Sequence, residues 1–510
     1  MNFSSTVNRR QFLQAGVLIA SGIGLNRNTS ADEVPVSRQK ELLRLTASRA
    51  TKAMQEGDIR AEAYAAAILG RCSELKTLNA FISLDPQKVL EAARSADKRR
   101  ASGTTLGPCH GLPIPVKDSV NTRDLPTTGG TRALRNYRPT ADAALVRTLF
   151  DAGAILLGKT NLHEMSFGIT SNNLAFGPIH NPYDQSRIPG GSSGGTAVAI
   201  ATQMAPLGVA EDTAGSVRIP AALCGIAGFR PTLGRYSTQG VIPLTSKFDT
   251  LGPHARAVED LILFDSVVAK EAETLRPTSL NGVRLGVPRT YYWEDLEDGV
   301  TRVVFDALQR LKDAGAILVE ADVPQVETLI DGSIGPIILC EAVANIEAFL
   351  RTNKAGLTFQ DLLAEMSPNV RAAFELLAVE GAPKKPSKEA YEAAVNVHRP
   401  ALQRVMREYF RDHDISAMVF PTTPLVARPI GEEPETLHNG KKYRTARIFS
   451  RNIYSGSCAG LPGLALPAGL TEQGLPVGIE FDAASGNDRE LLSLGLSLER
   501  ALGPVPAPQV

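Results

Sequence analysis

Apolar residues recur along the chain with two alternating spacings, one typical of helices and one typical of buried strands. Helical spacing runs through residues 39–100 and returns at 142–152. Short continuous apolar runs, which favour buried strands, occupy residues 154–157 and 207–210. This alternation of strands with helices predicts an α/β layer fold.

The second half of the chain contains a helix-rich portion followed by late strands. Helix-forming residues gather at 303–314, 342–350 and 391–410, with a Pro/Lys break at 383–386. We therefore predict that residues from about 270 to 415 form a helical portion packed over the sheet, where substrate pockets often vary. Apolar segments with glycine and proline at 417–424 and 460–481 predict the last strands of the same sheet.

The composition is that of a globular protein: 510 residues are 43% hydrophobic and 21% charged, with a formal net charge of +0. A balanced charge gives no electrostatic reason for a nucleic-acid partner or a membrane surface. We therefore expect no nucleic-acid binding and no stable membrane insertion. The 7 histidines and 5 cysteines contain no pair spaced as CxxC or HExxH, so we expect no metal site and no cofactor. One disulfide bridge remains open.

The N-terminus has the three-part layout of an export signal. Arg9 and Arg10 precede a modestly apolar run at 15–25, and small residues at 29–31 offer a cleavage site near Ala31. The paired arginines indicate the twin-arginine route, which carries folded proteins. We expect residues 1–31 to be the signal, residues 32–510 to be the working domain, and the protein to be periplasmic. An amphipathic helix with a chance arginine pair is the alternative.

Two clusters of small residues contain the candidate chemistry. Gly and Ser fill residues 190–195, and Ala214, Gly215 and Ser216 follow about twenty residues later. A predicted helix at 196–204 and the strand at 207–210 would bring the two clusters together. Glycines beside a serine leave backbone N–H groups uncovered, as an oxyanion hole requires. The alternative, a flexible Gly/Ser linker, does not explain two clusters around a structured segment.

Two other motifs are misleading in their context. Residues 153–160 fit the GxxxxGK[ST] pattern of a phosphate-binding loop, but their middle residues form a predicted strand and a helix precedes them. Residues 190–194 fit GxSxG, but a Pro-interrupted loop stands where the nucleophile elbow needs a strand. We therefore expect neither nucleotide binding nor the elbow of an α/β-hydrolase.

Lys117 is the candidate base, since no histidine stands in a suggestive context. A lysine has a pKa of about 10.4, so its neutral form costs roughly 4 kcal/mol at pH 7. Burial among apolar residues reduces that cost because it disfavours the ammonium. The competing interpretation is a surface lysine paired with Asp118.

Three segments together resemble the amidase signature family. They are GxPxxxKD at 111–118, PGGSSGG at 189–195, and the stretch from Asp212 to Pro220. The likeness extends over nearly all of residues 40–500. It implies a single large mixed β-sheet covered by helices on both faces, and a homodimer.

The resemblance also implies a Ser–Ser–Lys triad with an acyl-enzyme. Ser216 matches the nucleophile, Ser192 the bridging serine on a cis peptide, and Lys117 the base. Other matched positions are the oxyanion-hole backbone groups of Thr213, Ala214, Gly215 and Ser216, and the supporting residues Ser193, Asp212 and Arg218. Ala214 departs from the family, which more often has glycine there. Its Cβ restricts the loop and is expected to narrow acyl selection or slow the reaction.

Further stretches at 162–173, 221–225, 232–236 and 424–431 look like indoleacetamide and mandelamide hydrolases within that family. This likeness implies small aryl-substituted amides as substrates, with ammonia or a small amine leaving and Ser166 lining the acyl pocket. Arylamide, anilide or ester hydrolysis on the same triad remains open. So do a tRNA-linked amidotransferase subunit, which conflicts with the export signal, and an exported binding protein without catalysis.

Overall fold

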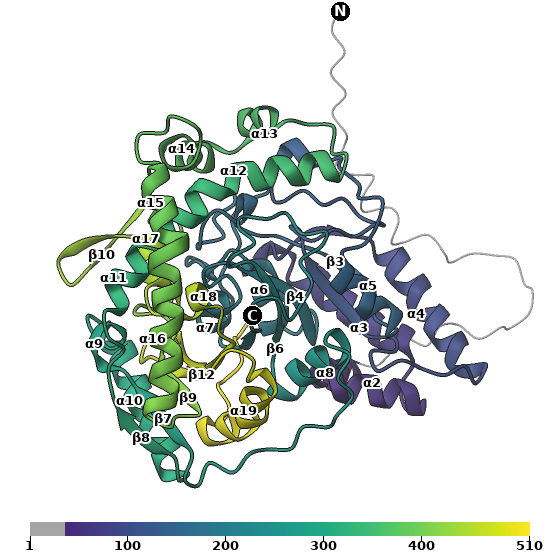
Figure 1. Cartoon of the computed structure of the whole chain (residues 1–510). Coiled ribbons are helices and arrows are strands. Elements are labelled where there is room, and N and C mark those ends of the chain that lie inside the picture. The colour runs from purple at the N-terminus through teal and green to yellow at the C-terminus, as the bar shows by residue number, and fades with distance from the viewer. Residues whose placement is uncertain (1–35) are drawn as a thin grey trace, which may run out of the picture.

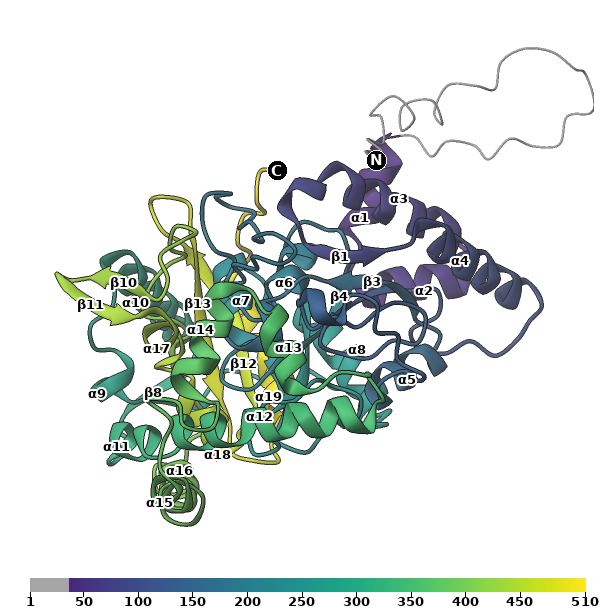
Figure 2. The same cartoon turned by 90° about the horizontal axis from the view of Figure 1, so that it is seen from above.

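An eleven-stranded sheet forms the centre of the computed structural model, which describes residues 36–510 (Figure 1). The expected export signal, 1–31, lies outside the described residues. The sheet order is β1-β3-β2-β4-β6-β5-β12-β13-β9-β7-β8, and β10 and β11 form a separate hairpin (Figure 2). The strands are β1 (Phe81–Leu84), β2 (Pro113–Lys117), β3 (Ile155–Thr160), β4 (Leu207–Asp212), β5 (Ala227–Arg230), β6 (Thr250–Ala255), β7 (Arg284–Val287), β8 (Ile317–Glu320), β9 (Ala417–Pro421), β10 (Glu435–His438), β11 (Lys441–Arg444), β12 (Gly463–Leu470) and β13 (Pro476–Asp482).

The sheet is mixed, because β2 runs parallel to both β3 and β4, whereas β4 pairs antiparallel with β6. The helices of the first half are α1 (Val36–Arg44), α2 (Ala47–Glu56), α3 (Ala61–Glu74), α4 (Pro86–Ala101), α5 (Ala144–Asp151), α6 (Gly194–Ala201), α7 (Arg218–Cys224) and α8 (Val258–Val268). Those of the second half are α9 (Arg289–Tyr292), α10 (Asp298–Asp313), α11 (Val326–Asp331), α12 (Ile334–Thr352), α13 (Phe359–Glu365), α14 (Pro368–Leu377), α15 (Lys388–Ala393), α16 (Arg399–Asp412), α17 (Thr445–Ser450), α18 (Tyr454–Ala459) and α19 (Asp488–Leu502).

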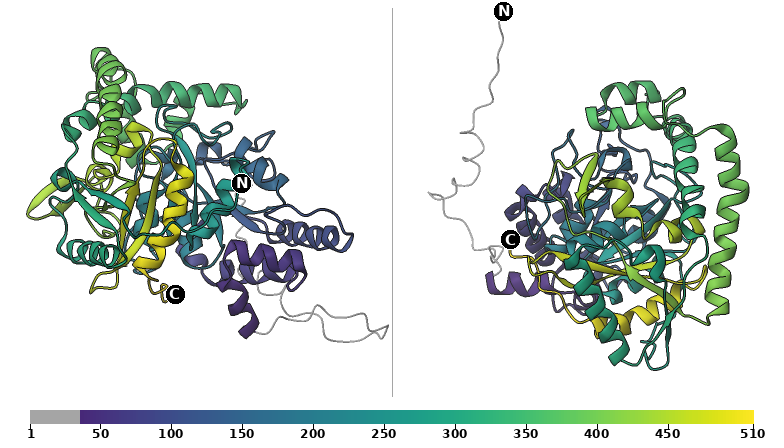
Figure 3. Two further views of the ribbon diagram at one scale, coloured as in Figure 1. Left: turned by 60° about the horizontal axis from the view of Figure 1, so that its bottom comes forward. Right: turned by 90° about the vertical axis from the view of Figure 1, so that its left-hand side faces the viewer.

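Helices cover both faces of the sheet, as predicted. On one face, Gly208 of β4 leaves room for α6, and Gly478 of β13 leaves room for α7. On the other face, Leu464 of β12 packs against α19, which lies along the strands in the left view of Figure 3. The α/β sandwich predicted from the alternating pattern is thus confirmed.

The region from about 270 to 415 is not wholly helical. Strands β7 and β8 lie within it and extend the main sheet at its far edge, with β7 parallel to β9. After β8 the chain leaves the sheet, forms the helices α11 to α16, and returns to it at β9 (Figure 1). A π-helical turn at Ala394–His398 joins α15 to α16, so the predicted helix at 391–410 is real but interrupted.

One helical stretch, Val326–Thr352, is long and apolar enough to cross a membrane by those two criteria alone. Its side chains Ile337, Ala342 and Ile346 are fully buried in this structure. Ala342 and Ile346 share a cluster with Met165 and Phe374, while Ile337 joins the neighbouring cluster. The stretch therefore contributes to the core beside the loop that carries Ser166.

Candidate active site

Lys117 is the last residue of β2, and its side chain is completely buried. Strands β3 and β4 flank β2 in parallel register, and all five residues of β2 are buried. The ammonium nitrogen Nζ donates a hydrogen bond of 2.6 Å to Ser192 Oγ. Two residues 75 positions apart in the chain are thereby joined in the way that the triad requires.

Ser192 lies in the turn that precedes α6, and the peptide bond between Gly191 and Ser192 is cis, as the resemblance implies. The Ser192 carbonyl accepts a hydrogen bond from the backbone of His163 at 3.0 Å. The next residue, Ser193, donates its hydroxyl to the Glu211 carbonyl at 3.1 Å, which ties the turn to β4. The expected supporting role of Ser193 therefore has a physical basis.

Ser216 lies in the turn between β4 and α7, and 8% of its surface is exposed. Within residues 36–510 its hydroxyl makes no hydrogen bond, unlike that of Ser192. The preceding Gly215 has a φ of 116°, a region that residues with a Cβ rarely adopt. A Cβ on Gly215 would also lie 2.1 Å from Ile453 Cδ1, so this turn depends on glycine.

Asp212 holds the Ser216 turn from below. Its carboxylate accepts hydrogen bonds from the backbone of Gly215 at 2.9 Å and of Val217 at 3.1 Å. The guanidiniums of Arg218 and Arg230 bind the same carboxylate at 3.1 Å and 2.8 Å. Burial alone would raise the pKa of Asp212, but the two guanidiniums outweigh burial and hold that pKa below its usual range. All three charged groups are fully buried.

The backbone N–H groups expected to form the oxyanion hole are not equivalent. Gly215 donates its N–H to Asp212, whereas those of Thr213, Ala214 and Ser216 donate to no group in the described part of the chain. The Thr213 hydroxyl donates to Asp249 Oδ1 at 2.7 Å. Burial and then the Glu211 charge raise the pKa of Asp249 to about 7. A cavity of about 90 Å³ reaches this carboxyl, and Val241, Pro243 and Asn345 also line it.

Glu211 is a site residue that the sequence patterns do not identify. Its Oε2 lies 3.2 Å from Lys117 Nζ and accepts hydrogen bonds from Ser119 at 2.7 Å and from Ser166 at 3.0 Å. Ser166, expected to line the acyl pocket, therefore contacts the base's neighbour. The signal that could identify Glu211 is an acid at the end of an apolar strand, directly before the Asp212 motif.

The competing interpretation of Lys117, a surface lysine paired with Asp118, is wrong. Asp118 instead forms a buried ion pair of 2.9 Å with Lys159, the lysine of the misleading phosphate-loop pattern. Burial lowers the pKa of Lys117, and the Glu211 charge opposes that shift without cancelling it. The neutral amine that a base requires is therefore more accessible than in a solvated lysine.

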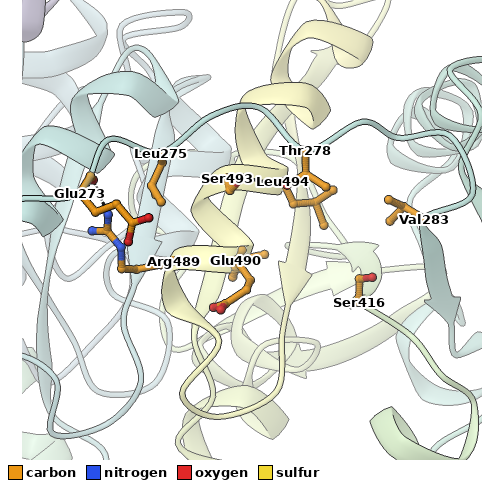
Figure 4. A pocket seen from close by; sticks show the side chains of 10 residues that line it. Glu273, Leu275, Thr278, Val283, Ser416, Arg489, Glu490, Ser493 and Leu494 are labelled. Carbon is orange, nitrogen blue, oxygen red and sulfur yellow. Dashed lines mark hydrogen bonds between the residues drawn. The ribbon is translucent and has the colours of Figure 1, made fainter. Parts of the chain in front are cut away.

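A second cavity, of about 500 Å³, lies away from these residues, between α19 and the segment before β7 (Figure 4). Arg489, Glu490 and Ser493 of α19 line it opposite Glu273 and Thr278. None of the predicted site residues is among its lining residues. All five cysteines of the chain are free, so the disulfide bridge left open by their number is not formed.

Comparisons with known proteins extend across this site. The model of the amidase family matches residues 64–492, which include Lys117, Ser192 and Ser216. An indoleacetamide hydrolase of Agrobacterium vitis is 40% identical over 436 residues, covering 85% of this chain and 92% of that relative. A mandelamide hydrolase of Pseudomonas putida is 35% identical over 485 residues, 92% of this chain and 94% of that relative. A crystal structure of an amidase has a TM-score of 0.80 at 31% identity, covering 90% of this chain and 100% of the other.

Proposed function

Because the chain belongs to the amidase family, whose members hydrolyse carbon–nitrogen bonds other than peptide bonds, we propose that it cleaves small aryl-substituted amides to a carboxylate and ammonia or an amine. Its relatives include proteins named for indoleacetamide and mandelamide, both small aryl amides. The apolar surroundings of Ser166 agree with an aromatic acyl group, since the adjacent Phe167 stacks on Phe374 with ring centroids 4.0 Å apart.

The reaction proceeds through Ser216 as nucleophile. The Lys117 amine takes the Ser192 proton, Ser192 takes that of Ser216, and the Ser216 oxygen attacks the amide carbonyl. Backbone N–H groups of the 213–216 turn receive the developing oxyanion. The same proton path in reverse protonates the leaving nitrogen, and water then hydrolyses the acyl-enzyme. The single observation that carries this proposal is the 2.6 Å hydrogen bond between Lys117 and Ser192.

A fluorophosphonate probe tests the nucleophile, because it forms a covalent bond with an activated serine. We expect the wild-type protein to be labelled at Ser216 and Ser216→Ala to remain unlabelled. Ser186→Ala, a change at a partly exposed hydroxyl bonded to Asp184, serves as the matched control and should label like wild type. Labelling that persists in Ser216→Ala would overturn the assignment, and absence of labelling in wild type would support a binding protein.

Turnover of a substrate panel tests the proposed acyl group. The panel contains benzamide, phenylacetamide, indoleacetamide, mandelamide, an anilide and an aryl ester, compared by kcat/KM. We expect the arylacetamides or mandelamide to exceed the others by at least tenfold. A clear preference for the anilide or the ester would replace the substrate proposal without affecting the triad.

We also propose that residues 1–31 direct export through the twin-arginine route, on the basis of Arg9 and Arg10. Replacing both arginines with lysine should retain the protein inside the cell in a bacterial host, as measured by fractionation. Equal export of both forms would contradict this proposal. The homodimer implied by the family likeness is tested by sedimentation of the mature chain.

A further inference from the structure

We propose that Glu211 is a positioning residue for this reaction, the counter-ion that stabilises the Lys117 ammonium as Ser216 attacks. The inference rests on the proposed function, since it concerns the proton that Lys117 receives. Glu211 Oε2 lies 3.2 Å from Lys117 Nζ, and the two side chains are 1% and 0% exposed. No water-exposed path screens this pair, so the charge on Glu211 acts on Lys117 at full strength.

The position of the Glu211 carboxylate is determined by several contacts. Oε2 accepts hydrogen bonds from Ser119, two residues after the base, and from Ser166, in the loop before α6. The Glu211 backbone also exchanges hydrogen bonds with the Ser193 hydroxyl, at 3.1 Å through its carbonyl and 3.3 Å through its N–H. One residue of β4 thus contacts the base directly and holds the turn of the bridging serine.

The other charged groups near Lys117 are already engaged. From β2, Asp118 is paired with Lys159, and from β4, Asp212 is paired with Arg218 and Arg230. Burial and the Glu211 charge raise the pKa of Asp249, beside β6, to about 7.

The two nearby histidines do not supply a charge at neutral pH. Burial lowers the pKa of His163, in the loop before α6, and of His254, in β6, to about 4 each, and both are therefore neutral. Glu211 is consequently the anion that faces the ammonium directly.

The chemistry explains why an anion is needed there. When the Ser192 proton reaches Lys117, a neutral buried amine becomes an ammonium ion, and an isolated buried cation is strongly unfavourable. With Glu211 beside it, the same transfer forms an ion pair. The aspartate of a Ser-His-Asp triad stabilises its imidazolium in the same manner. Glu211 also keeps Lys117 a stronger base than burial alone would allow.

The test is the pH profile of Glu211→Gln, which keeps the size of the side chain and removes its charge. We expect kcat to fall at least tenfold with little change in KM. We also expect the acid limb of kcat/KM to move to lower pH by one unit or more, because Lys117 loses the charge that raises its pKa. An acid limb at the wild-type pH would overturn the proposal.

Two further variants make the result decisive. Glu164→Gln removes another buried carboxylate, one that accepts hydrogen bonds from the Ser367 backbone at 3.2 and 3.3 Å, and it should leave the acid limb in place. Glu211→Asp keeps the charge but withdraws it by one methylene, and its limb should lie between those of wild type and Glu211→Gln. This variant tests the proposal even if Glu211→Gln does not fold, and an unshifted limb in Glu211→Asp would then overturn it. Loss of the proposed function is separate, because fluorophosphonate labelling of Ser216 reports on it directly.

Discussion

Substitution of Gly215 by alanine tests whether the geometry of the Ser216 turn limits catalysis. The new Cβ meets two obstacles. The φ of 116° is unfavourable for alanine, which costs about 1–3 kcal/mol. The Cβ would also lie 2.1 Å from Ile453 Cδ1 and 3.0 Å from Ile219 Cδ1, and overpacking of this kind costs about 1–3 kcal/mol.

Together these terms predict a loss of about 2–6 kcal/mol of unfolding free energy, if the turn keeps its shape. If the turn relaxes instead, the neighbouring N–H groups and the Ser216 hydroxyl move away from the substrate. Removal of one oxyanion donor reduces kcat by about 10²–10³. We therefore expect Gly215→Ala to lower kcat at least a hundredfold, to destabilise the protein, or to do both.

The assay combines kcat on the best amide of the panel with urea denaturation. Ile453→Val removes the Cδ1 atom that the new Cβ would meet, so the double variant Gly215→Ala/Ile453→Val should recover part of the loss. Gly474→Ala is the matched control, because Gly474 has a φ of 78° but no atom within 4 Å of a Cβ. It should reduce stability by about 1 kcal/mol and leave kcat unchanged. Wild-type kcat and stability in Gly215→Ala, or no recovery in the double variant, would refute the reasoning.

Three other changes have defined outcomes. Lys117→Ala should lose most of its kcat at pH 7, and Ser192→Ala nearly as much, as measured by amide turnover; wild-type turnover in Lys117→Ala would refute the base. Burial lowers the pKa of His254 from 6.5 to about 4, so its contribution to stability is full above pH 6.5 and is lost as the pH falls toward 4. That loss amounts to about 3 kcal/mol; urea denaturation of His254→Gln should show a flatter pH dependence, and an unchanged dependence would contradict the shift. Arg218→Lys loses the fork that binds Asp212 and Ser457, and the unfolding free energy should fall by about 3 kcal/mol; an unaltered urea midpoint would argue against this.

The elements next to the site follow closely from local patterns. The predicted helix at 196–204 corresponds to α6, and the predicted strand at 207–210 corresponds to β4. Both are short, almost wholly apolar, and bounded by glycine or charged residues, so few alternative structures fit them. Three other strands, β1, β7 and β8, have only four residues each. Their pairing depends on strands far away in the sequence, and a window of local residues does not contain that information.

The same distinction applies within the site. Lys117 and the two serines belong to motifs, so a family likeness identifies them before any coordinates exist. Glu211 acquires its role only from the parallel register in which Val116 of β2 lies opposite Val209 of β4. That register places an acid from one strand beside the base from another. The use of the Gly215 N–H by Asp212 is likewise a matter of local geometry, which a motif of residue types does not specify.

The departure of the chain from the sheet between β8 and β9 has an evolutionary consequence. The whole of α11 to α16 hangs between two edge-side strands that are both adjacent to β7, while the reacting groups occupy β2, β4 and the turns after them. Such a segment is a removable cassette. It can lengthen, shorten or be exchanged between relatives while every strand keeps its partner, so new preferences among amides can arise without rebuilding the machinery that breaks the bond.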